Sequence, residues 1–221
     1  MSSGYDFSKV KEYKLYSLFR PAAAIVCKTV QRCDYIGREN IPKEGGFILA
    51  CNHVNIFDPI ALGGAGVRVI HFMAKEELFE NKALGKFLTH LNAFPVERGK
   101  GDMASIHFAE NLIKKGYVLG IFPEGTRSKD YKPGRAKSGV ALIAKQTGAD
   151  VLPVSIYTDT QYKRGTKVTI RFGKLIKNEE FGFTEEGHSA ELKNAARRKA
   201  FEVDIIRRHG FAERHHRVAH P

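Results

Sequence analysis

The sequence contains no apolar run that approaches the roughly 20 residues a membrane-spanning helix requires. Its opening stretch, residues 1–14, is polar and carries no cleavable signal. It has only three cysteines, Cys27, Cys33 and Cys51, an odd number without the spacing of a metal site. We therefore expect a cytosolic protein that does not span a membrane. Its cysteines are expected to be reduced and to pack as small residues in the core.

Several motifs of nucleotide-binding and nucleophilic proteins are also missing. No Gly-x-Ser-x-Gly elbow is present, so a covalent intermediate on serine is not expected. Gly63, Gly64 and Gly66 do not form the dinucleotide fingerprint, and Gly99-Lys100-Gly101 is not a phosphate-binding loop. The histidines are not clustered at metal-ligand spacing. The sequence predicts neither a metal ion nor a bound cofactor.

What the sequence has in excess is positive charge. The formal net charge is +12, and the basic residues concentrate in residues 1–38 and in the tail after Leu192. Such a surface favours an anionic partner, which could be nucleic acid, an anionic bilayer or a phosphate-bearing substrate. The chain has no aromatic and basic RNP-type signature, so we do not expect nucleic acid.

The apolar pattern predicts an α/β fold in one domain. The 221 residues are 43% hydrophobic, enough to bury a core of ordinary single-domain size. Strand-like runs alternate with helical stretches from Gly46 onward, and the last two runs are joined by a short polar turn, which predicts an antiparallel pair. We expect a mixed, mostly parallel sheet flanked by helices. The predicted strands are 47–51, 67–73, 93–96, 117–122, 151–157 and 167–172, and the predicted helices are 59–65, 76–91, 102–115, 138–147 and 188–208.

The N-terminal segment has a different pattern. Residues 5–33 interleave basic residues with aromatic and apolar ones and pass through Pro21, which suggests two helices. Such a pair could lie flat on anionic headgroups, or it could be an ordinary helical pair that caps the core. We divide the chain into an amphipathic helical anchor at 1–38 and an α/β domain at 39–221.

His53 follows the first predicted strand, and Asp58 lies five residues further on, directly before Pro59. If an irregular loop joins the two side chains, Asp58 fixes the imidazole tautomer and the other ring nitrogen accepts a proton from a hydroxyl. Asp58 could instead be a helix N-cap, with Pro59 at the first helical position. His53 could equally be a solvated histidine, and His71 and Glu76 share the same spacing without suggesting any chemistry.

Charged residues also follow three later strands. Lys75 ends one run, and Arg98 follows another just before a predicted helix, which is a natural place for a phosphate. Either residue alone could be an ordinary surface charge. Because strand ends carry the chemistry of open α/β sheets, we expect these positions to share one cleft with His53.

The third strand end carries the stretch FPEGTRS. Glu124 could bind a substrate hydroxyl or pair with Arg127 to shape the loop, and Thr126 could stabilise the turn by local backbone bonds. Downstream basic residues could meet a nucleotide phosphate or form a solvated loop. The candidate substrate-binding residues are Lys75, Arg98, Glu124, Gly125, Thr126 and Arg127, beside the catalytic candidates His53 and Asp58.

In this order, NHVNIFD, FPVERG, FPEGTRS and VLPVSI resemble the four sequence blocks of the glycerolipid acyltransferase family, specifically its short 1-acylglycerol-3-phosphate acyltransferases. The segment KEELFENKALGKFLTHLNAF is also similar to the one that precedes the family's second block. The resemblance spans about residues 40–175. One departure is Asn55, where many members carry serine, although an amide can also form hydrogen bonds.

The resemblance implies acyl transfer from coenzyme A or acyl carrier protein to the sn-2 hydroxyl of lysophosphatidic acid. His53 would be the general base, oriented by Asp58, and Arg98, Lys75 and Arg127 would hold the phosphate while Glu124 and Gly125 shape the glycerol pocket. Because both lipids reside in a bilayer, it also implies an anionic membrane partner and a peripheral or monotopic place on the cytoplasmic face of a membrane. The alternatives are a related acyltransferase acting on glycerol-3-phosphate or another lysophospholipid, and a non-catalytic basic membrane-binding protein.

Overall fold

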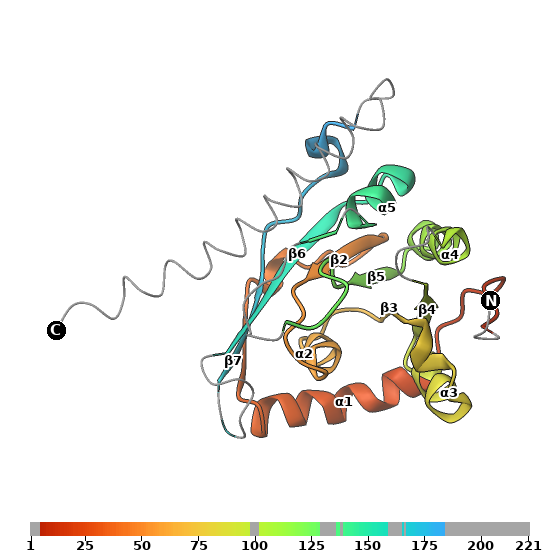
Figure 1. Ribbon diagram of the computed structural model, residues 1–221. Coiled ribbons are helices and arrows are strands. Elements are labelled where there is room, and N and C mark those ends of the chain that lie inside the picture. The colour runs from red at the N-terminus through yellow and green to blue at the C-terminus, as the bar shows by residue number, and fades with distance from the viewer. Residues whose placement is uncertain are drawn as a thin grey trace.

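A computed structural model describes residues 5–97, 102–128, 136–137, 139–158, 165 and 167–183 (Figure 1). Within them, seven strands form one sheet in the order β1-β7-β6-β2-β5-β3-β4. The strands are β1 (Cys33–Ile36), β2 (Phe47–Cys51), β3 (Ile70–Lys75), β4 (Ala93–Val96), β5 (Val118–Ile121), β6 (Val151–Thr158) and β7 (Val168–Phe172). The helices are α1 (Lys14–Thr29), α2 (Asp58–Gly64), α3 (Lys82–His90), α4 (Met103–Lys114) and α5 (Gly139–Thr147), with short 3-10 turns η1 (Arg38–Asn40), η2 (Glu76–Phe79) and η3 (Asn178–Phe181).

The sheet is mixed and mostly parallel, as predicted. β2 lies between β5 and β6 in parallel register, and β3 pairs in parallel with both β4 and β5. β6 and β7 form the predicted antiparallel pair. The carboxyl ends of β6, β2, β5, β3 and β4 therefore lie along one edge of the sheet, which is where an open α/β fold places its site.

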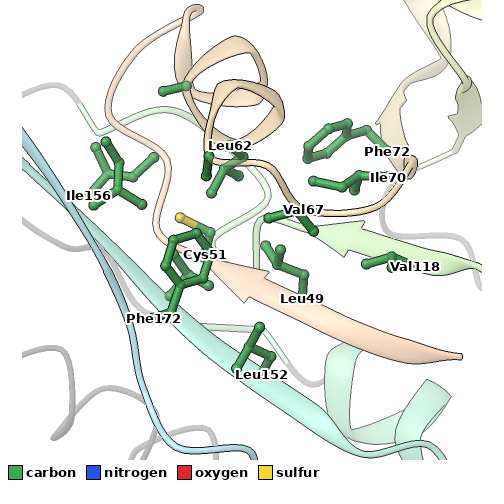
Figure 2. Packing of buried hydrophobic residues seen from close by; sticks show 14 of the residues in the cluster. Leu49, Cys51, Leu62, Val67, Ile70, Phe72, Val118, Leu152, Ile156 and Phe172 are labelled. Carbon is green, nitrogen blue, oxygen red and sulfur yellow. The ribbon is translucent and has the colours of Figure 1, made fainter. Parts of the chain in front are cut away.

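Helices cover both faces of the sheet (Figure 1). The side chains of β2 point alternately to the two faces and show which helices cover each one. Leu49 and Cys51 pack in a buried cluster with Leu62 of α2, whereas Ile48 and Ala50 pack in a second cluster with α4 and α5. Figure 2 shows part of the first cluster, where Leu62 lies among side chains from β2, β3 and β6. A strand buried on both faces reads as a continuous apolar run, which is why the sequence predicted β2 with its observed bounds.

Helix ends mostly follow the predicted signals. Gly116 and Gly148 have φ of +83° and +66°, the left-handed conformation that ends a helix, so both predicted stops are confirmed. The predicted helix 76–91 is instead split into η2 and α3. Asn81 causes the break, because its side-chain oxygen accepts hydrogen bonds from the backbone N–H groups of Ala83 and Leu84, both at 3.1 Å, and so starts a new helix.

The N-terminal prediction of two helices is wrong. Residues 5–33 contain one helix, α1, and Pro21 lies inside it at an exposed position. The helix tolerates Pro21 because the carbonyl of Ser17, which loses its hydrogen bond to residue 21, can bind water instead. Residues 5–13 are not helical. They pack against the α4 side, with the ring of Tyr5 5.7 Å from that of Phe108 and the backbone N–H of Tyr13 donating to Asn92 Oδ1 at 2.9 Å.

The predicted boundary at residue 38 also separates β1 from the sheet to which it belongs. β1 was not predicted because it is a half-buried edge strand and has no continuous apolar run. It includes Asp34, whose carboxylate pairs with the ammonium of Lys167 at 2.9 Å. Its parallel pairing with β7 joins residues 33–36 to the α/β domain. The predicted helix 188–208 lies outside the described residues. No helix in the described part of the chain is long and apolar enough to cross a bilayer.

Candidate active site

The candidate site begins where β2 ends. Residues 52–57 form an irregular loop between β2 and α2, and the side chains of His53 and Asp58 meet across it. His53 Nδ1 lies 2.7 Å from Asp58 Oδ2. The His53 side chain is 17% exposed while that of Asp58 is fully buried. The predicted pairing of these two residues is confirmed, and the loop before Pro59 makes it possible.

Asp58 holds more than the imidazole. Its Oδ2 also accepts hydrogen bonds from the backbone N–H groups of Val54 at 2.7 Å and Asn55 at 2.8 Å. The N-cap position of α2 is Phe57 and has no side-chain cap, so the alternative in which Asp58 is a simple N-cap is excluded. One carboxylate thus fixes both the loop backbone and the ring that the loop carries.

Asn55 takes part in the same loop. Its Oδ1 accepts a hydrogen bond from the backbone N–H of Phe57 at 3.1 Å. This is a local side-chain turn that a serine hydroxyl also forms, though more weakly. Asn55 is therefore compatible with the kind of turn that a serine at this position would form.

Asn52, which the sequence analysis did not single out, anchors the loop to the sheet. Its Oδ1 accepts from the N–H of Ile156 at 2.7 Å, and its Nδ2 donates to the carbonyl of Ile156 at 3.0 Å. The register between β2 and β6 is paired only to Cys51, so the amide continues the ladder one residue further. The available signal was a polar side chain at the end of an apolar strand, since a buried amide must find hydrogen-bonding partners.

The loop after β5 packs against His53 from the neighbouring strand. The Phe122 ring stacks on the imidazole with centroids 4.0 Å apart and an interplanar angle of 18°. The backbone N–H of Ser128 donates to the carbonyl of His53 at 2.8 Å. These contacts bring the first and third sequence blocks together, whereas a cleft shared with Lys75 and Arg98 stays a prediction.

The predicted residues of the loop 122–128 differ in exposure. Glu124 is only 4% exposed, and Gly125 has a φ of +67° in a turn closed by its N–H bond to the carbonyl of Phe122 at 2.9 Å. Thr126 and Arg127 are exposed. The loop that contacts His53 thus contains one buried carboxylate and one exposed arginine.

Lys75 ends β3, two strands away from β2 in the sheet order. Its ammonium pairs with Glu77 at 2.7 Å, and both side chains are about half exposed. Arg98, another of the three predicted phosphate ligands, lies outside the described residues.

The geometry around His53 suits an oriented proton acceptor. With its Nδ1–H donating to Asp58, the imidazole presents Nε2 as a proton acceptor. Within the described residues, no group of three or more potential metal-ligating side chains comes together. The chemistry that fits is proton removal from a hydroxyl that attacks an activated carbonyl.

The α/β sheet thus places an Asp-oriented histidine at the end of a parallel strand, an arrangement suited to an enzyme that transfers acyl groups. The chain belongs to the acyltransferase family, since the family's sequence model, described as Acyltransferase, matches residues 32–157. That match includes β1, the dyad and most of β6.

Several curated relatives carry more specific names than the family model. The chain is 42% identical over 119 residues to a 1-acyl-sn-glycerol-3-phosphate acyltransferase of Bacillus subtilis, which covers 53% of this chain and 59% of that protein. It is 32% identical over 149 residues to the enzyme of the same name from Streptococcus pneumoniae, which covers 64% of this chain and 54% of that protein. The chain thus spans little more than half the length of these relatives.

The fold has a solved counterpart. The crystal structure of the 1-acyl-sn-glycerophosphate (LPA) acyltransferase PlsC from Thermotoga maritima matches with a TM-score of 0.64 and 26% sequence identity, over 90% of this chain and 78% of that one. The α/β architecture inferred from the apolar pattern is therefore confirmed.

Proposed function

We propose that this protein transfers a fatty acyl group from a thioester of coenzyme A or acyl carrier protein to the sn-2 hydroxyl of lysophosphatidic acid, forming phosphatidic acid. The observation that carries the proposal is the 2.7 Å contact between His53 Nδ1 and Asp58 Oδ2 in a member of the acyltransferase family. The names of the B. subtilis and S. pneumoniae relatives supply the acceptor.

In the proposed reaction, His53 Nε2 takes the proton of the acceptor hydroxyl as its oxygen attacks the thioester carbonyl. The carbon–oxygen bond forms, the carbon–sulfur bond breaks, and the leaving thiolate takes the proton back from the imidazolium. General-base assistance of this kind contributes about 10²–10⁴-fold to the rate. Asp58 stabilises the imidazolium and holds the ring in one tautomer. No cofactor takes part, because the thioester is a co-substrate.

The acceptor phosphate is proposed to bind Lys75, Arg98 and Arg127. Lysine and arginine are both phosphate ligands, and Lys75 can exchange its exposed partner Glu77 for a phosphate at small cost, since exposed ion pairs contribute about 0–1 kcal/mol. Glu124, Gly125 and Thr126 would line the glycerol pocket beside His53. The buried position of Glu124 suits a carboxylate that accepts a hydrogen bond from a substrate hydroxyl.

The membrane partner is proposed to contact the outer face of α1. Leu18 and Ile25 lie seven residues apart, hence on one face, and are 72% and 63% exposed. Tyr16 and Cys27 are the buried residues of this helix, so α1 has an apolar side in the protein and another facing outward. Phe19 extends the outer surface to Phe87 of α3, their rings being 6.3 Å apart.

Exposed Lys14 and Lys28 at the two ends of α1 suit anionic headgroups on the cytoplasmic face of a membrane. A double substitution, Leu18→Ser with Ile25→Ser, tests this surface. Deleting residues 1–38 is unsuitable, because β1 and residues 5–13 belong to the folded domain. The double variant should lose binding to anionic vesicles, whereas Leu142→Ser, an exposed leucine on α5, should retain it. Unchanged vesicle binding of the double variant contradicts the proposed anchor.

The function is tested by offering purified protein a labelled acyl-thioester with lysophosphatidic acid, glycerol-3-phosphate or lysophosphatidylcholine. Acylation of lysophosphatidic acid that disappears in His53→Ala supports the proposal, provided that circular dichroism shows an intact fold. Preference for glycerol-3-phosphate or the choline lipid indicates the related-acyltransferase alternative. Vesicle binding without any acylation indicates the non-catalytic alternative.

A further inference from the structure

Lys137 lies against the loop that contains Glu124 and Gly125, although it comes twelve positions after Gly125 in the sequence. Its backbone N–H donates to the carbonyl of Pro123 at 2.8 Å. This bond fixes the Lys137 backbone to the loop that packs on His53. The Lys137 side chain therefore starts from a fixed point beside this loop.

Gly125 shows where that side chain runs. A Cβ atom added to Gly125 would lie 3.1 Å from Lys137 Nζ, 3.3 Å from Cε and 3.4 Å from Cδ. The end of the lysine thus passes over the glycine at contact distance. Gly125 also has a φ of +67°, so glycine is favoured here for two independent reasons: the turn and the room for Lys137.

The same loop is tied to the dyad on either side of Gly125. Phe122, three residues before it, stacks on the His53 ring at 4.0 Å, and Ser128, three residues after it, donates its N–H to the carbonyl of His53 at 2.8 Å. Lys137 is exposed, so its ammonium can reach a ligand that enters from solvent. A positive charge therefore sits on the loop that borders the candidate base.

We propose that Lys137 is a further substrate-binding residue, whose ammonium contacts a phosphate group of a substrate bound beside His53. The inference rests on the proposed acyl transfer and adds Lys137 to the residues that bind the substrates of that reaction. An ammonium is a compact charge with three donors on a flexible stem, which suits a phosphate more than an uncharged glycerol hydroxyl. The phosphate belongs either to the lysophosphatidic acid acceptor or to the phosphopantetheine or nucleotide part of the donor.

The test compares Lys137→Met with the unchanged protein. Methionine keeps an unbranched side chain over Gly125 and removes the ammonium charge together with its N–H donors. The variant should raise KM for one phosphate-bearing substrate roughly 10–100-fold, the factor that corresponds to a hydrogen bond to a charged group, with kcat little changed. Lys137→Arg should restore most of the affinity, and Lys145→Met on α5, another exposed lysine, should leave KM unchanged.

Substrates without phosphate identify which group is bound. If the acceptor phosphate is the ligand, Lys137→Met should affect lysophosphatidic acid and leave monoacylglycerol turnover unaltered. If the donor phosphate is the ligand, acyl-coenzyme A should be affected and the acyl thioester of N-acetylcysteamine should not. An equal loss of activity with all four substrates would overturn the proposal, because Lys137 would then only stabilise the loop. No loss of activity with any of them would also overturn it, because Lys137 would then bind no phosphate.

A binding measurement separates this inference from the proposed function. Amine labelling of the intact wild-type protein, mapped by mass spectrometry, should show Lys137 protected by lysophosphatidic acid or by coenzyme A, with Lys145 labelled equally in both conditions. Protection in a protein that transfers no acyl group would support the phosphate site while the transferase proposal fails. Undiminished labelling of Lys137 at saturating concentrations of both probes would contradict the site whatever the activity.

Discussion

Two stretches of this chain place an acid five residues after a histidine, and the fold uses them in opposite ways. His53 follows the end of β2 in an irregular loop and meets Asp58, whereas His71 is the second residue of β3 and Glu76 begins η2. His71 is 2% exposed and its Nε2 lies 3.3 Å from the carbonyl of Lys11. The spacing is therefore not the determinant: a strand end followed by a helix start lets the two side chains meet, and a continuing strand prevents it.

The largest effect is expected from Asp58→Asn. A neutral amide keeps the size of the side chain but no longer stabilises an imidazolium or fixes its tautomer, so kcat for lysophosphatidic acid acylation should fall about 10²–10⁴-fold. Steady-state kinetics on the folded variant measure this. A loss below about threefold would mean that the dyad has no catalytic role, since typical base assistance is far larger.

The histidine of the other stretch should control stability instead. Burial lowers the pKa of His71 to about 4, because desolvation of the imidazolium outweighs the contact with the Lys11 carbonyl. The unfolded chain has the higher pKa, about 6.5, so it binds the proton first as the pH falls. Stability is thus fully present above about pH 6.5 and decreases, by at most about 3 kcal/mol, as the pH falls to about 4.

Urea unfolding at several pH values checks this dependence against His71→Gln. The glutamine variant should lose less stability than the wild type on acidification, because carboxylates contribute equally to both proteins. Identical pH dependence of the two proteins would show that His71 does not titrate as its burial requires.

Asn52→Ala should sharpen the contrast by loosening only the first stretch. It leaves the backbone N–H and carbonyl of Ile156 without their partner, which should lower the free energy of unfolding by about 1–3 kcal/mol and also reduce kcat. Asn40→Ala is the matched control, since Asn40 donates to the carbonyl of Phe172 at 3.1 Å on the β7 side of the sheet. The control should destabilise without lowering kcat. Equal activity losses in both variants would argue against a positioning role for Asn52.

The smallest effect is expected from Asn55→Ser, which installs the residue common in the family. A serine hydroxyl can accept the Phe57 N–H bond, so the free energy of unfolding should change by less than about 0.5 kcal/mol and kcat/KM by less than about threefold. Thermal unfolding and steady-state assays measure both quantities. A tenfold change in kcat/KM would show that the amide contacts substrate.

Sequence reasoning succeeded where the relevant physics is local. The buried runs of β2 and β4 were predicted with their observed bounds, and Gly116 and Gly148 were read correctly as helix stops. The contact of His53 with Asp58 was predicted on the condition that a loop precedes Pro59, and that loop exists.

It failed where distant partners decide. Asn52 is 104 residues from Ile156, so neither its bonds nor the stacking of Phe122 on His53 follow from local pattern. Residues 5–13 resemble an amphipathic helix in composition, yet they are not helical, and Tyr5 and Phe7 contact Phe108 on the core. Pro21 suggested a break that the exposed helix α1 tolerates.

The central claim is tested most directly by comparing kcat/KM for acylation of lysophosphatidic acid among the wild type, His53→Ala and His71→Gln at neutral pH, with folding checked by circular dichroism. We predict that His53→Ala loses about 10²-fold or more while His71→Gln stays within about threefold of the wild type. A folded His53→Ala protein that turns over lysophosphatidic acid at the wild-type rate would contradict the account.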